Sequence, residues 1–284
     1  MEATEKHETS GGGAPCPSCG TANTAAVSYV YAIGRIEPRF PRLSVEKEFA
    51  QASAQSDGAG RTDHQTLHDV LSKPENRYLV RNMCWVLTIE GLDTYILVPR
   101  DPADFQLLVD AVRTTSSRLD LDAVVGVRGP IASPDMCNGL TVPIVLFDQV
   151  YSFDRDSLLK AIPAPKGKKD AADQFAAAAS ELFDRIMLMA DNAGATDEHR
   201  ALNYLALRYP AIYHTAIEMF DKNASLSAVE VRPSSLSGAR RVVDVIFTYT
   251  NRQTDVADKH FCRVDVTEQF PFLMSKLSPY YDRF

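Results

Sequence analysis

The spacing of hydrophobic and polar positions divides the chain into a first part of strands and short helices, a helical middle and a C-terminal part of strands. Runs of β-branched and aromatic residues in the first part predict a strand over 26–40, a hairpin over 85–99 and buried strands at 124–127 and 142–147. In the hairpin, two such runs flank Gly91-Leu92-Asp93, which is typical of a tight turn.

Polar capping residues followed by apolar residues at helical spacing predict short helices that begin near Ser44, Thr62, Glu75, Asp101 and Asp154. Thr62 and Gln65 have the spacing of a capping box. Farther along, Phe175, Leu182 and Ile186 repeat at helical spacing, and Thr196 can cap a second long helix. We therefore expect a long helical pair around 171–221.

The C-terminal part alternates apolar and polar residues over 226–232, 241–249 and 260–266, which predicts a three-strand antiparallel meander. Strands and helices alternate irregularly along the chain. This favours an α+β fold with a mixed or antiparallel sheet, hairpins and the meander, covered by helices, over a doubly wound sheet.

Residues 1–15 are polar and Gly-rich, which is typical of a disordered leader, and 16–284 are interpreted as one domain. A Pro- and Lys-rich stretch at 163–170 is a possible boundary inside it. There is no apolar run near the roughly 18 residues of a membrane span, and no apolar region of a signal peptide. Together with an odd number of cysteines, five, this indicates a cytoplasmic protein without a disulfide scaffold.

The formal net charge of −7 argues against nucleic acid or an anionic membrane surface as a partner. A P-loop, a glycine-rich dinucleotide turn, a nucleophile elbow and a kinase motif set are all absent from the sequence. The catalytic residues, if there are any, are therefore unknown.

The motif Cys16-Pro17-Ser18-Cys19-Gly20 has the spacing of half a zinc site. Cys137, in a loop, and Cys84, at a helix-to-strand junction, are the best candidates for the other two ligands. Four thiolates make a closed, structural zinc site with no open position for catalysis. The alternative is that all of these cysteines are free thiols. Cys262 lies within a strand and is expected to be a buried apolar residue.

Two other polar groups are candidate binding residues. Arg35, Glu37 and Arg39 share one face of the first strand, where they could hold a carboxylate or phosphate or form a simple ion-pair ladder. Asp197, Glu198 and His199 follow the Thr196 cap, where acidic side chains also favour a helix start without any further role.

Several segments together resemble the C-terminal domain, a domain of unknown function, of PatG-type cyanobactin maturation proteases. These segments are Ser28–Pro41, Val45–Gln51, Cys84–Leu92, Met136–Leu140, Asp191–Arg200 and Ser278–Asp282. The resemblance covers nearly all of the chain after residue 15. In that family the domain is attached to a subtilisin-like macrocyclase. No protease domain is found here, so we expect a freestanding accessory domain, and no protease residue can be carried over.

The resemblance implies a role in the biosynthesis of ribosomally synthesised, post-translationally modified peptides (RiPPs). We expect a non-catalytic, zinc-stabilised module that binds a precursor peptide or a peptide-modifying enzyme. One alternative is an enzyme of unrecognised type acting on a modified peptide, which requires the polar candidates to converge in one pocket. Another is a structural module that forms a homodimer.

Overall fold

The computed structural model describes residues 27–54, 61–115, 117–162, 170–188 and 191–281. The first part contains β1 (Tyr29–Arg39), α1 (Leu43–Ala54), α2 (Asp63–Leu71), α3 (Arg77–Asn82), β2 (Cys84–Ile89), β3 (Leu92–Pro99), α4 (Phe105–Ala111), β4 (Asp120–Ile131) and β5 (Pro143–Asp154). The second part contains α5 (Arg155–Ala161), α6 (Asp170–Met187), α7 (Asp197–Arg208), α8 (Ala211–Asp221), β6 (Ala224–Pro233), β7 (Val242–Asn251), β8 (Ala257–Asp265) and β9 (Phe272–Pro279).

The first five strands close into a barrel in the order β1-β2-β3-β5-β4. All neighbours are antiparallel except β3 and β5, which are parallel. β1 changes partner along its length: residues 29–34 pair with β4 and residues 35–39 pair with β2. At the change lies Gly34, where a Cβ atom would stand 2.5 Å from the Thr88 carbonyl oxygen, so only glycine fits.

The helix caps and the hairpin turn that the sequence predicts are present in the structure. Thr62 accepts a hydrogen bond from the Gln65 backbone and the Gln65 side chain accepts one from Thr62, which completes the predicted capping box. The hairpin turns at Glu90 and Gly91, whose φ angles of 50° and 81° are those of a two-residue primed turn. Asp101 caps the turn before α4 through the Ala103 amide.

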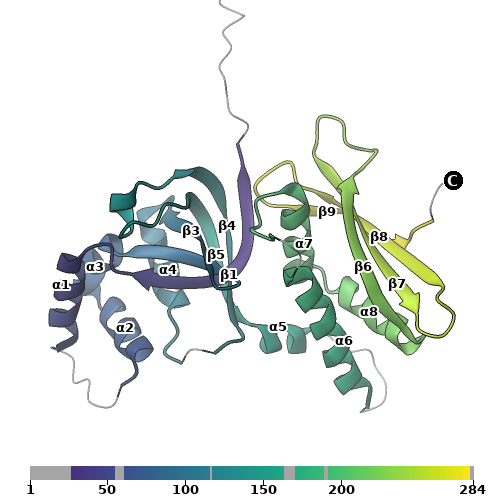
Figure 1. The fold of residues 1–284 in the computed structure, drawn as a ribbon, viewed down its shortest axis with the longest axis horizontal. Coiled ribbons are helices and arrows are strands. Elements are labelled where there is room, and N and C mark those ends of the chain that lie inside the picture. The colour runs from purple at the N-terminus through teal and green to yellow at the C-terminus, as the bar shows by residue number, and fades with distance from the viewer. Residues whose placement is uncertain (1–26, 55–60, 116, 163–169, 189–190, 282–284) are drawn as a thin grey trace, which may run out of the picture.

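Helices α1 to α4 pack against the barrel on the side away from the second sheet (Figure 1). Their apolar residues, such as Val70, Leu79 and Leu108, form one core with barrel residues that include Leu87 and Phe147. The single tryptophan, Trp85, is buried in this core, and its indole N–H donates to the Val80 carbonyl oxygen at 2.9 Å.

The second sheet is antiparallel, in the order β6-β7-β8-β9. One face packs on α6, α7 and α8, and Val245, Phe247 and Val264 from the sheet meet Leu205 and Ile217 from the helices in a second core. The α+β class and the C-terminal antiparallel strands are confirmed. The predicted meander is one strand short, because the sequence of β9, FLMSKLSP, contains no β-branched residue and so lacks the usual pattern of a strand.

The two parts are joined along β1, on the half of that strand that β2 does not reach. There the backbone N–H of Tyr31 donates to the Gly194 carbonyl oxygen at 2.9 Å, and Asn203 Nδ2 donates to the Tyr31 carbonyl oxygen at 2.8 Å. The chain at Asn192–Ala195 thus takes the place of a neighbouring strand. Gly194 has a φ of +69°, and a Cβ there would be 2.4 Å from the Tyr31 oxygen.

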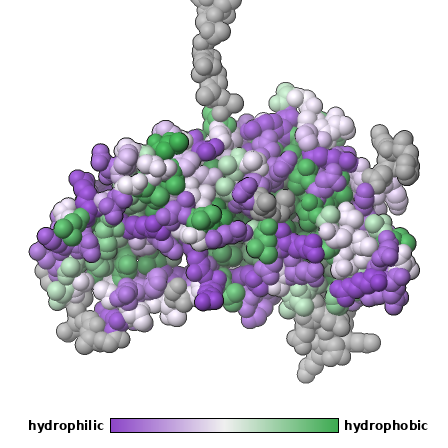
Figure 2. Space-filling view, viewed as in Figure 1, coloured by the Kyte–Doolittle hydropathy of each residue, from purple (hydrophilic) through white to green (hydrophobic). Residues whose placement is uncertain are grey.

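Hydrophilic residues are spread over both parts of the face in Figure 2, with hydrophobic residues between them. Among the helices within the described ranges, none is long and apolar enough to cross a membrane.

Candidate functional site

A cavity of about 400 Å³ opens between β1, α2, the end of α4 and the start of β4. Most of its polar wall comes from the ends of elements, where charged side chains begin. It is lined by Arg35, Glu37, His64, Arg113, Asp120 and Asp122, with Leu67 and Val112 among its apolar residues. Two of the predicted binding residues, Arg35 and Glu37, therefore meet at one cavity.

Arg35 is the one residue in this wall whose charge has no ionic partner within the described ranges. Its guanidinium donates one hydrogen bond, from Nη2 to the Ser117 carbonyl oxygen at 2.8 Å. A guanidinium carries five N–H donors in a planar fork, so donors remain free to bind a ligand oxygen.

The guanidinium group of Arg113 is already paired with other residues of the protein. Its guanidinium lies 2.9 Å from an Asp120 carboxylate oxygen and 3.9 Å from Asp122, and it donates to the carbonyl oxygens of Leu121 and Phe153. These contacts fix the start of β4 against the end of β5. Arg113 shapes the cavity wall but has little capacity left for a ligand.

Asp122 is a buried carboxyl group, 3% exposed, in the floor of the cavity. It accepts hydrogen bonds from the Ile36 amide at 2.9 Å and from Ser152 Oγ at 2.6 Å. Burial raises the pKa of Asp122 above its usual value, while those two hydrogen bonds and Arg113 act in the opposite direction. The carboxyl is therefore easier to protonate than an exposed aspartate.

Arg39 turns away from the cavity toward β3. It forms a two-pronged ion pair with Asp93, at 2.5 and 2.6 Å, and a third contact with Glu37 at 3.2 Å. The three residues on this face of β1 thus divide between two roles. Arg39 and Glu37 form an ion-pair ladder across to Asp93, while Arg35 faces the cavity.

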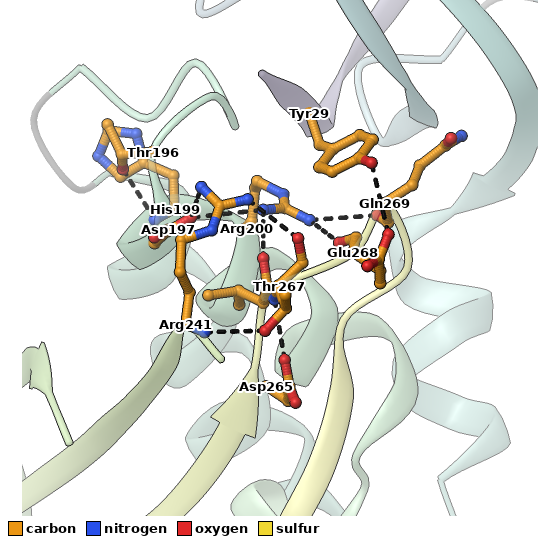
Figure 3. A network of polar contacts seen from close by, with 11 residues as sticks. Tyr29, Thr196, Asp197, His199, Arg200, Arg241, Asp265, Thr267, Glu268 and Gln269 are labelled. Atoms are coloured by element: carbon orange, nitrogen blue, oxygen red, sulfur yellow. Dashed lines mark hydrogen bonds and ion pairs between the residues drawn. The ribbon is translucent and has the colours of Figure 1, made fainter. Parts of the chain in front are cut away.

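Asp197, Glu198 and His199 lie at the start of α7, in the second part of the fold, and none of them lines this cavity. Figure 3 shows Asp197 and His199 in their own polar network. Thr196 Oγ1 accepts from the His199 amide at 3.1 Å, as a helix cap. Asp197 pairs with Arg241 at 3.2 Å and with Arg200 at 3.4 Å. The six predicted binding residues are therefore not brought together in one site.

Arg200, the next residue, was not among the candidates, yet it is the centre of this network. It is 1% exposed and donates to the carbonyl oxygens of Val266 at 2.8 Å, Gln269 at 3.3 Å and Glu268. Its guanidinium also lies over the Tyr29 ring (Figure 3). Burial lowers the pKa of Arg200 to about 10. A charged residue among the apolar positions of α7 was the sequence signal for this role.

Cys84 and Cys137 lie 53 residues apart in the sequence and are joined by a buried disulfide bond, with their Cα atoms 5.6 Å apart. The expectation that the chain has no disulfide is wrong for this pair. A disulfide sulfur offers no thiolate, so the oxidised pair holds no metal ion. Cys262 is a buried free cysteine, as predicted.

The other two predicted zinc ligands, Cys16 and Cys19, lie outside the described residues. Within the described ranges, three or more His, Cys, Asp or Glu side chains are nowhere grouped so that they could hold a metal ion. The four-thiolate zinc site stays a prediction.

The fold is that of a two-sheet α+β domain, a closed barrel joined to a helix-covered antiparallel sheet. Residues 169–280, which cover α6 to β9, match the model of the PatG C-terminal family. A solved structure described as "PatG Domain of Unknown Function" shares the fold with a TM-score of 0.73. The alignment of the two structures covers 89% of this chain and 98% of the solved chain, with 19% sequence identity.

The search of curated proteins found no match. The resemblance read from the sequence is nevertheless confirmed: residues 169–280 match the PatG C-terminal family, and the solved PatG domain shares the fold.

Proposed function

We propose that the chain is a non-catalytic module that binds a precursor peptide, or an enzyme that modifies one, during the biosynthesis of RiPPs. The family supports this pathway, since residues 169–280 match the PatG C-terminal model. One observation carries the binding role. Arg35 faces a cavity of about 400 Å³ with guanidinium donors to spare and no acidic partner within the described part of the chain.

The ligand group that best fits Arg35 is a carboxylate. Its two oxygens match the guanidinium fork, and a hydrogen bond to a charged group contributes roughly 1.5–3 kcal/mol. His64, exposed on α2 at the cavity wall, adds a further ring nitrogen that can hydrogen-bond the ligand. A peptide that ends in the cavity would place its terminal carboxylate against Arg35 and its last side chain against Leu67 and Val112.

The test uses a neutral eight-residue peptide, labelled at its N-terminus, with either a free C-terminal carboxylate or a carboxamide. Binding is followed by fluorescence anisotropy, and amide NMR shifts locate the site. We expect the carboxamide form, and the variant Arg35→Met with the carboxylate form, to bind about 10- to 100-fold more weakly. Arg118→Met, an exposed arginine outside the cavity, is the matched control.

Equal binding of the carboxylate and carboxamide forms would remove the role given to Arg35. If neither the peptide nor any pathway enzyme binds the wild-type protein, the binding module itself is refuted.

The zinc site belongs to the same proposal as a structural element. Reduction of the Cys84–Cys137 bond would release two thiols side by side, which is half of a tetrahedral thiolate site. Cys16 and Cys19 would supply the other half. Metal analysis and thiol counting on protein prepared under reducing conditions test this. One zinc per chain with these four thiols protected from alkylation supports the site; no zinc refutes it.

An enzyme acting on a modified peptide is a second candidate, favoured by one observation. Asp122, whose pKa is raised by burial, lines the same cavity as Arg35 and could donate a proton to a bound peptide. Turnover of a pathway peptide that disappears in Asp122→Asn, while the peptide still binds, would establish this reading. Binding without turnover in the wild-type protein would exclude it for that peptide.

A further inference from the structure

Two adjacent hollows lie on the helical side of the barrel, away from Arg35. The first, about 380 Å³, lies between α3 and the start of α4. The second, about 330 Å³, lies between α3, β3 and the turn that carries Met136. Arg81 and Phe105 line both hollows, so the two share a wall.

Apolar side chains form part of the lining of both hollows, beside polar ones. Leu71, Val80 and Val109 line the first, and Met83 and Ile96 line the second. Apolar walls gain free energy when an apolar side chain of a partner displaces water from them, by roughly 25 cal/mol for each Å² buried.

Three arginines stand at these hollows: Arg42, Arg77 and Arg81. All three are exposed, and their guanidinium groups make no hydrogen bond or ion pair with any described residue. Arg77 and Arg81 are four residues apart on α3, so they lie on the same face of that helix. Asp135 is the acidic residue that lines the hollows.

Many other arginines in the described part of the chain are held by the fold. The chain has a formal net charge of −7, and arginines such as Arg39, Arg113 and Arg263 are ion-paired within the fold. A group of unpaired cations around an apolar surface is therefore a local feature with its own electrostatic field.

We propose that the two hollows are a docking site for an acidic linear peptide segment that carries apolar side chains. Carboxylates of the segment pair with Arg42, Arg77 and Arg81, and apolar side chains between them enter the hollows on either side of Phe105. The inference rests on the proposed peptide-binding function, but it uses residues that the Arg35 cavity does not include.

Other partners fit less well. A nucleic acid would meet a protein of net charge −7, and its phosphates would leave the apolar walls uncovered. A small anion would pair with the arginines but would fill neither hollow. An acidic peptide with apolar side chains satisfies both features at once.

The test uses a fluorescein-labelled twelve-residue peptide of alternating glutamate and leucine, and the same peptide with glutamine in place of glutamate. We expect the acidic peptide to bind at least tenfold more tightly at 50 mM salt, and this advantage to shrink at 300 mM salt, because exposed charges are screened. The double variant Arg77→Glu/Arg81→Glu should lose at least tenfold in affinity. Lys160→Glu/Lys276→Glu, at exposed cations elsewhere, makes the same change in charge and should not lose affinity.

Each outcome decides between the two proposals. If the acidic peptide binds and the Arg77/Arg81 variant keeps full affinity, this docking site is refuted, and a loss in Arg35→Met would place that peptide in the other cavity. Equal binding of the glutamine peptide would refute charge recognition here. If the Arg35 cavity binds its neutral peptide but the acidic peptide does not bind at all, the docking site alone falls. If no peptide binds anywhere, the docking site and the peptide-binding role of the Arg35 cavity both fall.

Discussion

Asn203 on α7 donates a hydrogen bond from Nδ2 to the carbonyl oxygen of Tyr31 on β1, 172 residues earlier, at 2.8 Å. The Asn203 side chain is fully buried, and it also exchanges hydrogen bonds with the amide of Asn192. The Asn203 side chain therefore provides hydrogen-bond partners both for the β1 backbone and for Asn192, in the segment that lies along β1. This explains why Asp191–Arg200, one of the family-like segments, is rich in polar residues: it is the joint between the two parts.

We expect Asn203→Ala to destabilise the protein by about 2–3 kcal/mol, because the Tyr31 oxygen and the Asn192 amide lose a buried partner. Urea unfolding measures this. Asn82→Ala, at an exposed position on α3, is the matched control and should change the free energy of unfolding by less than about 0.5 kcal/mol. An equally mild effect at Asn203 would show that water or a shift of the backbone replaces the joint.

Gly194→Ala should be worse than an ordinary substitution at a turn glycine. Its φ of +69° disfavours a side chain, and the new Cβ would also stand 2.4 Å from the Tyr31 oxygen. Gly139→Ala separates the two effects, since Gly139 has a φ of +89° with open space around it. We expect Gly139→Ala to cost about 1–2 kcal/mol and Gly194→Ala clearly more, by thermal or urea unfolding. Equal costs would mean that the joint yields without strain.

The buried carboxyl of Asp122 predicts a pH dependence with a definite sign. Its folded-state pKa lies above the ordinary value of 3.8, so the folded protein holds this proton more tightly than the unfolded chain does. Its favourable contribution is complete below the unfolded pKa and is lost as the pH rises through the folded pKa. Asp122→Asn cannot lose a proton there.

The free energy of unfolding of Asp122→Asn, relative to wild type, should therefore rise between pH 4 and pH 7. Urea unfolding at four pH values checks the slope, and Asp135→Asn, at an exposed aspartate, serves as the control. A relative stability that falls with pH would mean that Arg113 and the hydrogen bonds outweigh burial.

The Cys84–Cys137 bond closes a loop with a sequence separation of 53 residues, and it should stabilise the folded state by roughly 4 kcal/mol in the chain-entropy treatment. Adding a reductant should lower the unfolding midpoint accordingly when zinc is absent. The double variant Cys84→Ala/Cys137→Ala should no longer respond to reductant. A wild-type protein that is indifferent to reductant would show that the two thiols are not bonded in solution.

Much of the local structure could be predicted because its causes lie close together in the sequence. The Thr62 capping box, the turn at Gly91 and the cap at Thr196 each depend on residues within a few positions of one another. The closure of the barrel could not be predicted. It depends on the parallel pairing of β3 with β5, and on β1 changing partner at Gly34, and neither leaves a local pattern.

The candidate sites show the same limit. Arg35 and Arg39 share a strand face by simple alternation, but only the position of Asp93 on β3 decides that Arg39 is paired and Arg35 is not. Cys84 and Cys137 were expected to share one site and do lie together, as a disulfide rather than as metal ligands. The sequence did not predict the role of Arg200. Its partners are the backbone carbonyls of Val266, Glu268 and Gln269, and every residue has such a carbonyl whatever its side chain.

The segment that covers β1 has a consequence for dividing this protein into fragments. Asn192–Ala195 belongs by sequence to the second part, but its hydrogen bonds hold the first. A barrel expressed alone up to residue 162 would therefore leave the Tyr31 end of β1 as a bare strand edge, which invites intermolecular pairing. The two halves should instead complement each other in trans only when the second carries residues 191–203. Any soluble minimal version of the barrel needs that stretch grafted back as a surrogate strand.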